Sequence, residues 1–134
     1  MTQNIVRTGI VNIGGVFYMF DADGKLYSYS STLGSKTLVA DLKTALGNTN
    51  FAADDHIKSG YDSENEVVYF YRVKTEMLYA FKVSDWSKIL ELSVPSTLLG
   101  LSGQDRRKIG MTYHGGRVLF TYFDTVTILK NQGE

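Results

Sequence analysis

One pattern occurs three times along the chain, and this repeat limits the fold more than any other feature. The three copies begin at Gly9, Gly60 and Gly110, about 50 residues apart. Each copy reads as a strand, a short polar or glycine turn, and a second strand rich in aromatic residues. A repeat of this length indicates one supersecondary unit that buries its apolar faces against its neighbours.

The repeat continues beyond the aromatic strand. Residues 26–29 match residues 78–81, and residues 126–129 occupy the same place in the third copy. A fourth strand follows in the first two copies, at 37–40 and 89–92. Turns of two to four residues join antiparallel neighbours. The sequence therefore predicts an all-β chain of about three four-stranded antiparallel meander units that are propeller-like.

We expect a single domain over residues 1–134, with units at approximately 9–54, 60–103 and 109–134. Residues 4–7 form a spare strand, which we expect beside Val126–Leu129 to complete the third unit, supplied in a closed ring by a neighbouring copy. Asp41–Gly47 has a capping aspartate and a terminal glycine, which predicts one or two helical turns.

The alternation of side chains in the aromatic strands indicates burial on both faces. In residues 16–20, Val16, Tyr18 and Phe20 share one face, and Phe17 and Met19 share the other. Both faces are apolar, which is typical of a sheet that packs between two other layers. The side chains that we expect to be mostly buried are those of Tyr18, Phe20, Tyr69, Tyr71, Phe120 and Tyr122.

Two segments resemble blades of the quinoprotein-like and kelch-like β-propellers. In residues 79–90, a strand that ends in residues of the Leu-Tyr-Ala-Phe type is followed by a polar turn and by a second strand that starts with Lys-Ile-Leu. Residues 17–27 look like the hairpin that precedes such a segment. The resemblance implies a propeller-like arrangement of sheets. The alternatives are a β-trefoil or another barrel. Because Trp86 is the single tryptophan, the resemblance implies no quinone cofactor.

Charge and composition exclude several classes of function. Fourteen basic residues balance fourteen acidic ones, so we expect neither nucleic acid nor a membrane as partner. Cysteine is absent, which excludes disulfides and thiolate metal sites. The sequence shows neither the pattern of a signal peptide nor an apolar run long enough to span a membrane. We therefore favour a virion or cytoplasmic location, although the sequence does not fix it.

Three polar segments are candidates for metal, catalytic or phosphate sites, and we interpret each of them as a turn or loop. Asp21–Gly24 lacks the glutamate that a calcium loop of the EF-hand type requires at its twelfth position. Asp54-Asp55-His56 has only His114 as another histidine, and Arg106-Arg107-Lys108 is an isolated basic run. We therefore predict no catalytic, cofactor-binding or metal-binding residues, and no cofactor.

The function expected from these features is a non-enzymatic structural or assembly protein. The protein would associate with further copies of itself or with other subunits of a larger assembly. We favour a component of a phage tail or virion. In organisation the chain resembles the propeller domains of tail-nozzle proteins. The alternative is a carbohydrate- or protein-binding module of the lectin type, with a glycan as ligand. A small enzyme, marked by a metal or cofactor at His56 or His114, ranks third.

Overall fold

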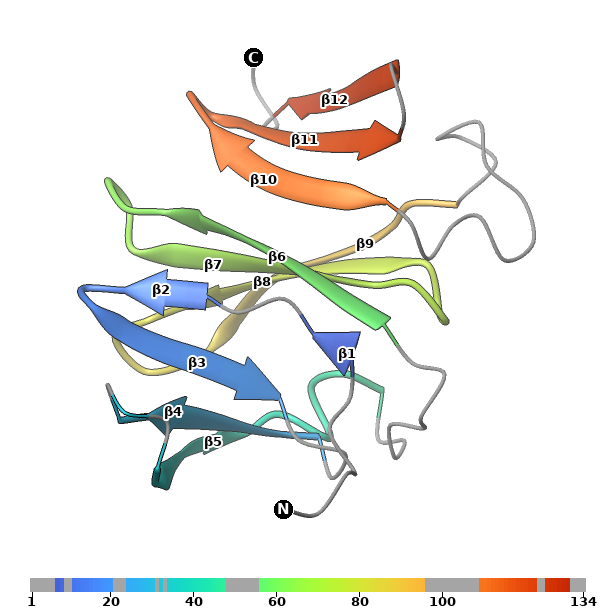
Figure 1. The fold of residues 1–134 in the computed structure, drawn as a ribbon. Helices are drawn as coiled ribbons and strands as arrows, with labels where there is room; N and C mark the ends of the chain where they lie inside the picture. Colours follow the sequence, from blue (N-terminus) through green and yellow to red (C-terminus); the bar gives the residue numbers. More distant parts are fainter. Residues whose placement is uncertain are drawn as a thin grey trace. The chain divides into compact units, whose positions relative to one another are not determined.

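A computed structural model describes residues 7–8, 11–20, 24–30, 32, 34–47, 56–95, 109–122 and 125–130, with side chains for all of these except 7–8, 122 and 125–130. The chain forms two compact units, Met1–Ile57 and Lys58–Glu134. The described elements are strands, and they form three sheets (Figure 1).

The first sheet is a four-stranded antiparallel meander in the first unit. Its strands follow the order β2 (Val11–Ile13), β3 (Val16–Phe20), β4 (Lys25–Tyr29) and β5 (Lys36–Asp41). Gly14 and Gly15 form the first turn with φ angles of 61° and 88°, where a side chain would be strained. The Gly15 N–H donates to Asn12 Oδ1 over 2.9 Å, which closes this turn.

The second sheet has five strands, in the order β1 (Arg7–Thr8), β6 (His56–Asp62), β7 (Val67–Arg72), β8 (Met77–Lys82) and β9 (Lys88–Ser93), and β1 is parallel to β6. Each pair of successive strands from β6 to β9 is joined through a turn that contains one residue with a positive φ angle, and these residues are Glu66, Glu76 and Trp86. The carbonyl oxygen of Glu66 accepts from Val83 N–H at 3.0 Å, and that of Glu76 accepts from Val94 N–H at 2.9 Å. These bonds join the first turn to the third turn, and the second turn to the residue that follows β9.

The third sheet contains β10 (Gly110–His114), β11 (Arg117–Tyr122) and β12 (Thr125–Lys130), all antiparallel. It lies against the second sheet within the same unit (Figure 1). The side chains between these two sheets form one apolar core, made of Tyr71, Val73, Leu78, Val94, Ile109, Val118 and Phe120.

Tyr71 is central to this core. Its ring meets that of Phe120 edge to face, with 5.1 Å between centroids, and its hydroxyl donates to the Val94 carbonyl oxygen over 2.6 Å. The Tyr71 ring therefore makes an apolar contact with the third sheet, while its buried hydroxyl has a hydrogen-bond partner. Together these two contacts fix how the two sheets pack.

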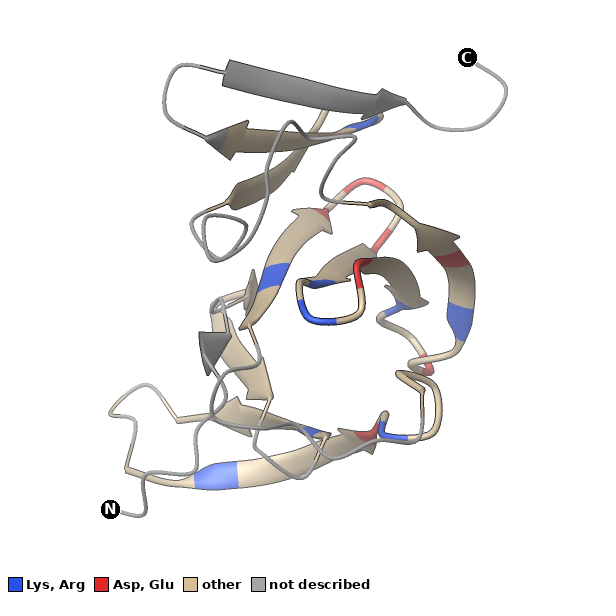
Figure 2. Ribbon diagram, turned by 90° about the vertical axis from the view of Figure 1, so that its right-hand side faces the viewer, with Lys and Arg blue, Asp and Glu red and all other residues tan. Residues whose placement is uncertain are grey.

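Charged residues occur in the turns, as at Glu64, and within strands, as at Lys58 of β6 and Lys88 of β9 (Figure 2). The described part of the chain contains no helix that is long and apolar enough to cross a membrane.

The all-β prediction is confirmed: the described strands form largely antiparallel sheets of four, five and three strands, and there is no closed barrel among them. The meander strands occur where the repeat places them. Phe20, Tyr71 and Phe120 are buried as expected, but Tyr18 and Tyr69 are only half-buried, and the Tyr122 side chain lies outside the described residues.

Two local expectations need correction. Arg7 and Thr8 form β1, which pairs in parallel with His56 and Ile57 of β6, so Arg7 does not lie beside β12; residues 4–6 lie outside the described residues. In residues 41–47 the expected helical turn is present, with Leu46 N–H donating to the Leu42 carbonyl oxygen, but Asp41 lies outside it because it still belongs to β5.

Candidate functional site

An open pocket lies between two hairpin turns of the second unit, one joining β6 to β7 and the other joining β10 to β11. Its volume is about 380 Å³, within the range of small-ligand pockets. The two turns lie together because β6 and β10, the strands that lead into them, approach closely at Gly60. The lining residues are Tyr61, Asp62, Ser63, Glu64, Asn65, Tyr113, His114, Gly115 and Gly116.

Gly60 allows the close approach of β6 to β10. A Cβ atom built at Gly60 would lie 3.0 Å from the backbone nitrogen of Tyr113 and 3.1 Å from the carbonyl carbon of Thr112. Real Cβ atoms almost never come closer than this to backbone atoms, so only glycine fits without a shift. The glycine that starts the second repeat therefore sets the spacing of the strands below the pocket.

Asp62 organises the base of the pocket. It is only 4% exposed, and its carboxylate accepts from the backbone N–H groups of Glu64 and Asn65, at 3.1 and 3.2 Å, and from Asn65 Nδ2 at 2.8 Å. Tyr113 donates a further hydrogen bond to it. Burial acts to raise the pKa of Asp62, but the hydrogen bonds from Asn65, Tyr113 and Glu64 outweigh it and hold this pKa below its usual value.

Tyr113 connects the pocket to the core between the two sheets. Its ring stacks on Tyr69 with centroids 5.2 Å apart and planes 9° from parallel. Burial raises the pKa of Tyr69, and the neighbouring Tyr113 and Asp62 raise it further, so the Tyr69 phenol stays protonated at neutral pH. These contacts hold the Tyr113 ring in one orientation beside the pocket.

Exposed groups on the two turns complete the lining. Glu64 and Asn65 come from the first turn and His114 from the end of β10, and all three are exposed. A carboxylate, an amide and an imidazole together offer both donors and acceptors. Because the bonds within the turn occupy Asp62, these exposed groups are the ones that a ligand can reach.

The structure separates the residues that the sequence singled out. His56 is buried at the start of β6, whereas His114 lines the pocket. Among the described residues, no three histidine, cysteine or acidic side chains form a group that could hold a metal ion. Asp21–Asp23, Asp54-Asp55 and Arg106–Lys108 lie outside the described residues.

Sequence reasoning missed Asp62, Glu64 and Asn65. Their signal is present, because Asp-Ser-Glu-Asn between two apolar runs is typical of a turn in which the aspartate side chain caps the following N–H groups. The pairing of this turn with His114 depends on how the sheets pack, and no sequence spacing indicates it.

Asp62 gives the stability of the protein a specific pH dependence. Because its folded pKa lies below the ordinary value of 3.8, Asp62 stabilises the fold above about pH 4 and loses this contribution as the pH falls through its folded pKa. We expect Asp62→Asn to lower the free energy of unfolding at pH 7 by about 1–3 kcal/mol and to flatten its decline below pH 4. Urea unfolding between pH 7 and pH 2 measures both effects.

Asn65→Ala should have an intermediate effect, because it removes one of the hydrogen bonds to the carboxylate. If Asp62→Asn and the wild type gave parallel curves of stability against pH, the carboxylate would have no such role.

No protein-family model matches the chain, and the comparison with curated proteins gives no match. The chain is similar to a solved structure whose fold is of the β-propeller type. That structure is the glutaminyl cyclase of Myxococcus xanthus, with a TM-score of 0.56 and 16% sequence identity. The match covers 97% of this chain and 48% of the other, so the chain spans about half the length of that protein.

This finding corrects one expectation. The sequence led us to expect that the chain is not an enzyme, but the solved structure that it matches is an enzyme. The expectation rested on the lack of a catalytic motif in the sequence. At this identity the likeness shows the fold alone.

Proposed function

We propose that the chain is a binding module for a small hydroxyl-rich ligand of the sugar class, held in the pocket between the two hairpin turns. The observation that carries the proposal is the pairing of fixed tyrosines with exposed polar groups around one pocket of ligand size. This is the glycan-binding alternative derived from the sequence, now assigned to particular residues.

The chemistry of the lining favours a sugar over an apolar ligand. A sugar presents both apolar C–H groups and many hydroxyls. Tyr61 and Tyr113 supply half-buried rings, while Glu64, Asn65 and His114 supply acceptors and donors for hydroxyls. A few polar groups placed around aromatic side chains are the usual composition of a small-ligand site.

Titration with neutral mono- and disaccharides tests the proposal, with isothermal calorimetry and amide chemical shifts as readouts. Glu64→Gln and His114→Ala should each weaken binding about tenfold, the effect of losing one hydrogen bond to a charged or polar group. Lys74→Ala is the matched control, because Lys74 is exposed on a turn at the other end of the second sheet. Equal affinity in all variants, or no binding by the wild type, would contradict the proposal.

Turnover is measured in the same experiment because the matched solved structure is a glutaminyl cyclase. The substrate is a peptide with an N-terminal glutamine, and the readout is release of ammonia. Release that Glu64→Gln abolishes would reassign the pocket from binding to catalysis.

A second candidate function is assembly, as the sequence suggested, through association with another copy or with other subunits. It is favoured by large apolar side chains exposed on the last strands of two sheets: Leu38 on β5 at 53%, and Ile89 and Leu92 on β9 at 49% and 41%. In this proposal the three sheets are successive blades of a propeller-type ring. A phage tail or virion component stays a prediction for the setting of such an assembly.

A further inference from the structure

The lining of the pocket is unequal in charge. Asp62 and Glu64 are acidic, and none of the described residues that line the pocket is lysine or arginine. Among these lining residues, His114 is the other one whose side chain can be charged near neutral pH, and its imidazole offers an acceptor when it is neutral. The pocket therefore carries net negative charge, although basic and acidic residues balance over the whole chain.

The charge of Asp62 is held by the turn that it caps. Its carboxylate accepts hydrogen bonds from two backbone N–H groups, from Asn65 Nδ2 and from Tyr113, which occupy about four lone-pair positions. Burial acts to raise its pKa, but these hydrogen bonds hold the pKa below the usual value, so Asp62 is ionised at neutral pH. Asp62 therefore makes the potential in the pocket more negative without offering a free acceptor to the ligand.

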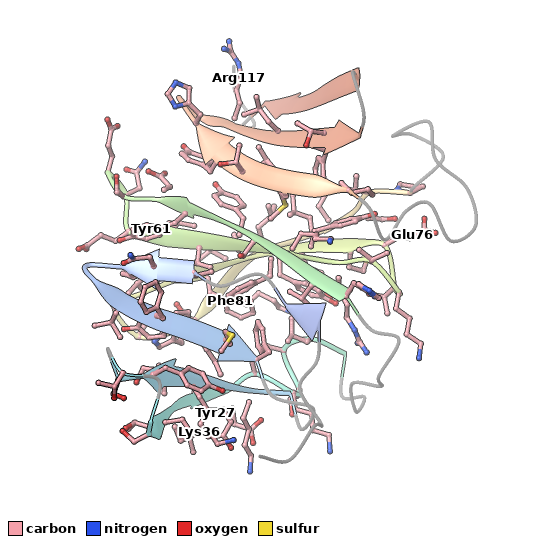
Figure 3. All side chains as sticks on the ribbon, in the orientation of Figure 1. Tyr27, Lys36, Tyr61, Glu76, Phe81 and Arg117 are labelled. Carbon is pink, nitrogen blue, oxygen red and sulfur yellow. The ribbon has the colours of Figure 1, made fainter. Side chains whose placement is uncertain are left out.

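Glu64 offers the carboxylate that a ligand can contact. It is exposed in the same turn, and its side chain has no ion-pair partner among the described residues. Arg117 lies on the facing hairpin, opposite His114 in the register of β10 and β11, but it does not line the pocket. Figure 3 shows the Arg117 side chain pointing away from the second sheet, and therefore away from the turn that carries Glu64.

Two aromatic rings add to the preference for a cation. Tyr61 and Tyr113 are half-buried and line the same pocket as Glu64. The face of an aromatic ring attracts a cation, and an ammonium group beside such rings gains from this attraction. Stacking on Tyr69 holds the Tyr113 ring in place, so this ring does not have to be ordered when a ligand binds. Carboxylate and aromatic groups together favour an ammonium group over a neutral or anionic group.

We propose that the pocket selects an amino sugar, whose ammonium group binds the Glu64 carboxylate while its hydroxyls bind Asn65 and His114. The inference rests on the proposed sugar-binding function and names the class of sugar. Glu64 is the residue that determines specificity, because an amino sugar and its neutral counterpart differ in the group that Glu64 contacts. An anionic sugar is disfavoured, because the two carboxylates of the pocket repel it.

Calorimetric titration with glucosamine, glucose and glucuronate at about pH 7 tests the proposal. At this pH an ordinary imidazole is mostly neutral, and an amine of the α-amino type is mostly protonated. We expect glucosamine to bind about fivefold to tenfold more tightly than glucose, the gain from one partly exposed ion pair, and glucuronate to bind most weakly. Raising the ionic strength from about 0.01 M to about 1 M shortens the Debye length from about 30 Å to about 3 Å. This change should reduce the preference for glucosamine and leave the affinity for glucose unchanged.

Two substitutions of equal size in one turn locate the selectivity. Glu64→Gln removes the charge that the ammonium group contacts, so the ratio of glucosamine affinity to glucose affinity should fall to about one or two. Glu66→Gln is the matched control, because Glu66 is exposed in the same turn but does not line the pocket. This variant should keep the ratio of the wild type. Amide chemical shifts outside the turn show whether both variants keep the fold.

The outcomes separate this inference from the proposed function. Equal affinity for glucosamine and glucose, or an unchanged ratio in Glu64→Gln, would overturn the selection of an amino sugar and leave sugar binding standing. Glycinamide carries an ammonium group without sugar hydroxyls, so it should bind more weakly than glucosamine. Equal binding of these two ligands would mean that the pocket recognises any amine, which would overturn the assignment to a sugar. Binding of none of the three sugars would contradict the proposed function itself and this inference with it.

Discussion

Tyr71→Ala is expected to lower the free energy of unfolding by about 3–5 kcal/mol, as truncation of a large buried aromatic does. Tyr71 has 0% exposure and lies between the second and third sheets. The variant removes the edge-to-face contact with Phe120 and leaves the Val94 carbonyl oxygen without its donor. Urea unfolding followed by circular dichroism measures the loss.

Two further variants divide this effect into its parts. Tyr71→Phe keeps the ring but removes the hydroxyl, and it should cost about 1–3 kcal/mol because a buried carbonyl loses its hydrogen bond. Ile89→Ala, at a position that is 49% exposed, should change stability by less than about 1 kcal/mol. A loss for Tyr71→Ala as small as that of Ile89→Ala would mean that the two sheets do not pack through Tyr71.

Gly60→Ala is expected to destabilise the protein by about 1–3 kcal/mol through overpacking. The added methyl group meets the backbone of Thr112 and Tyr113, which cannot rotate away as a side chain can. Separation of β6 from β10 would also move Tyr113 away from Asp62. We therefore expect the same variant to weaken sugar binding, measured by calorimetry at a temperature where the variant is folded.

Gly34→Ala is the matched control for this substitution. Its Cβ atom would meet only the Thr32 hydroxyl, at 3.3 Å, in an exposed loop. Stability should change by less than about 0.5 kcal/mol. If Gly60→Ala were as mild as Gly34→Ala, the close approach of the two strands would not be needed for the fold.

The sheets could be predicted from the sequence because their causes are local. Alternating aromatic residues, the Gly14-Gly15 and Gly115-Gly116 turns and the repeated spacing each act within one hairpin. Burial was less predictable, since it depends on what lies beside a sheet. Tyr18 and Phe20 are two positions apart in one strand, so the sequence places them on the same side of the sheet. In the structure, however, Phe20 is 1% exposed and Tyr18 is half-buried.

The candidate site could not be predicted as a unit. His114 and Asp62 are 52 positions apart in the chain, and only the packing of the third sheet on the second places them around one pocket. Asp62 itself was not predicted as a site residue, because its sequence pattern is that of a residue that caps a turn. Arg7 was wrongly placed beside β12 for a related reason: a short segment carries too little pattern to indicate its partner strand.

The positive φ angles at Glu66, Glu76 and Trp86 have a consequence for how this protein can diversify. The backbone at each of these three positions makes a hydrogen bond, although the residues are of three unrelated kinds: a surface acid, a half-buried acid and an indole. The side chains of such turns can therefore vary while the strands stay in register. Since the first of these turns lines the pocket, ligand preference can evolve at Ser63 and Glu64 while Asn65 keeps its hydrogen bond to Asp62.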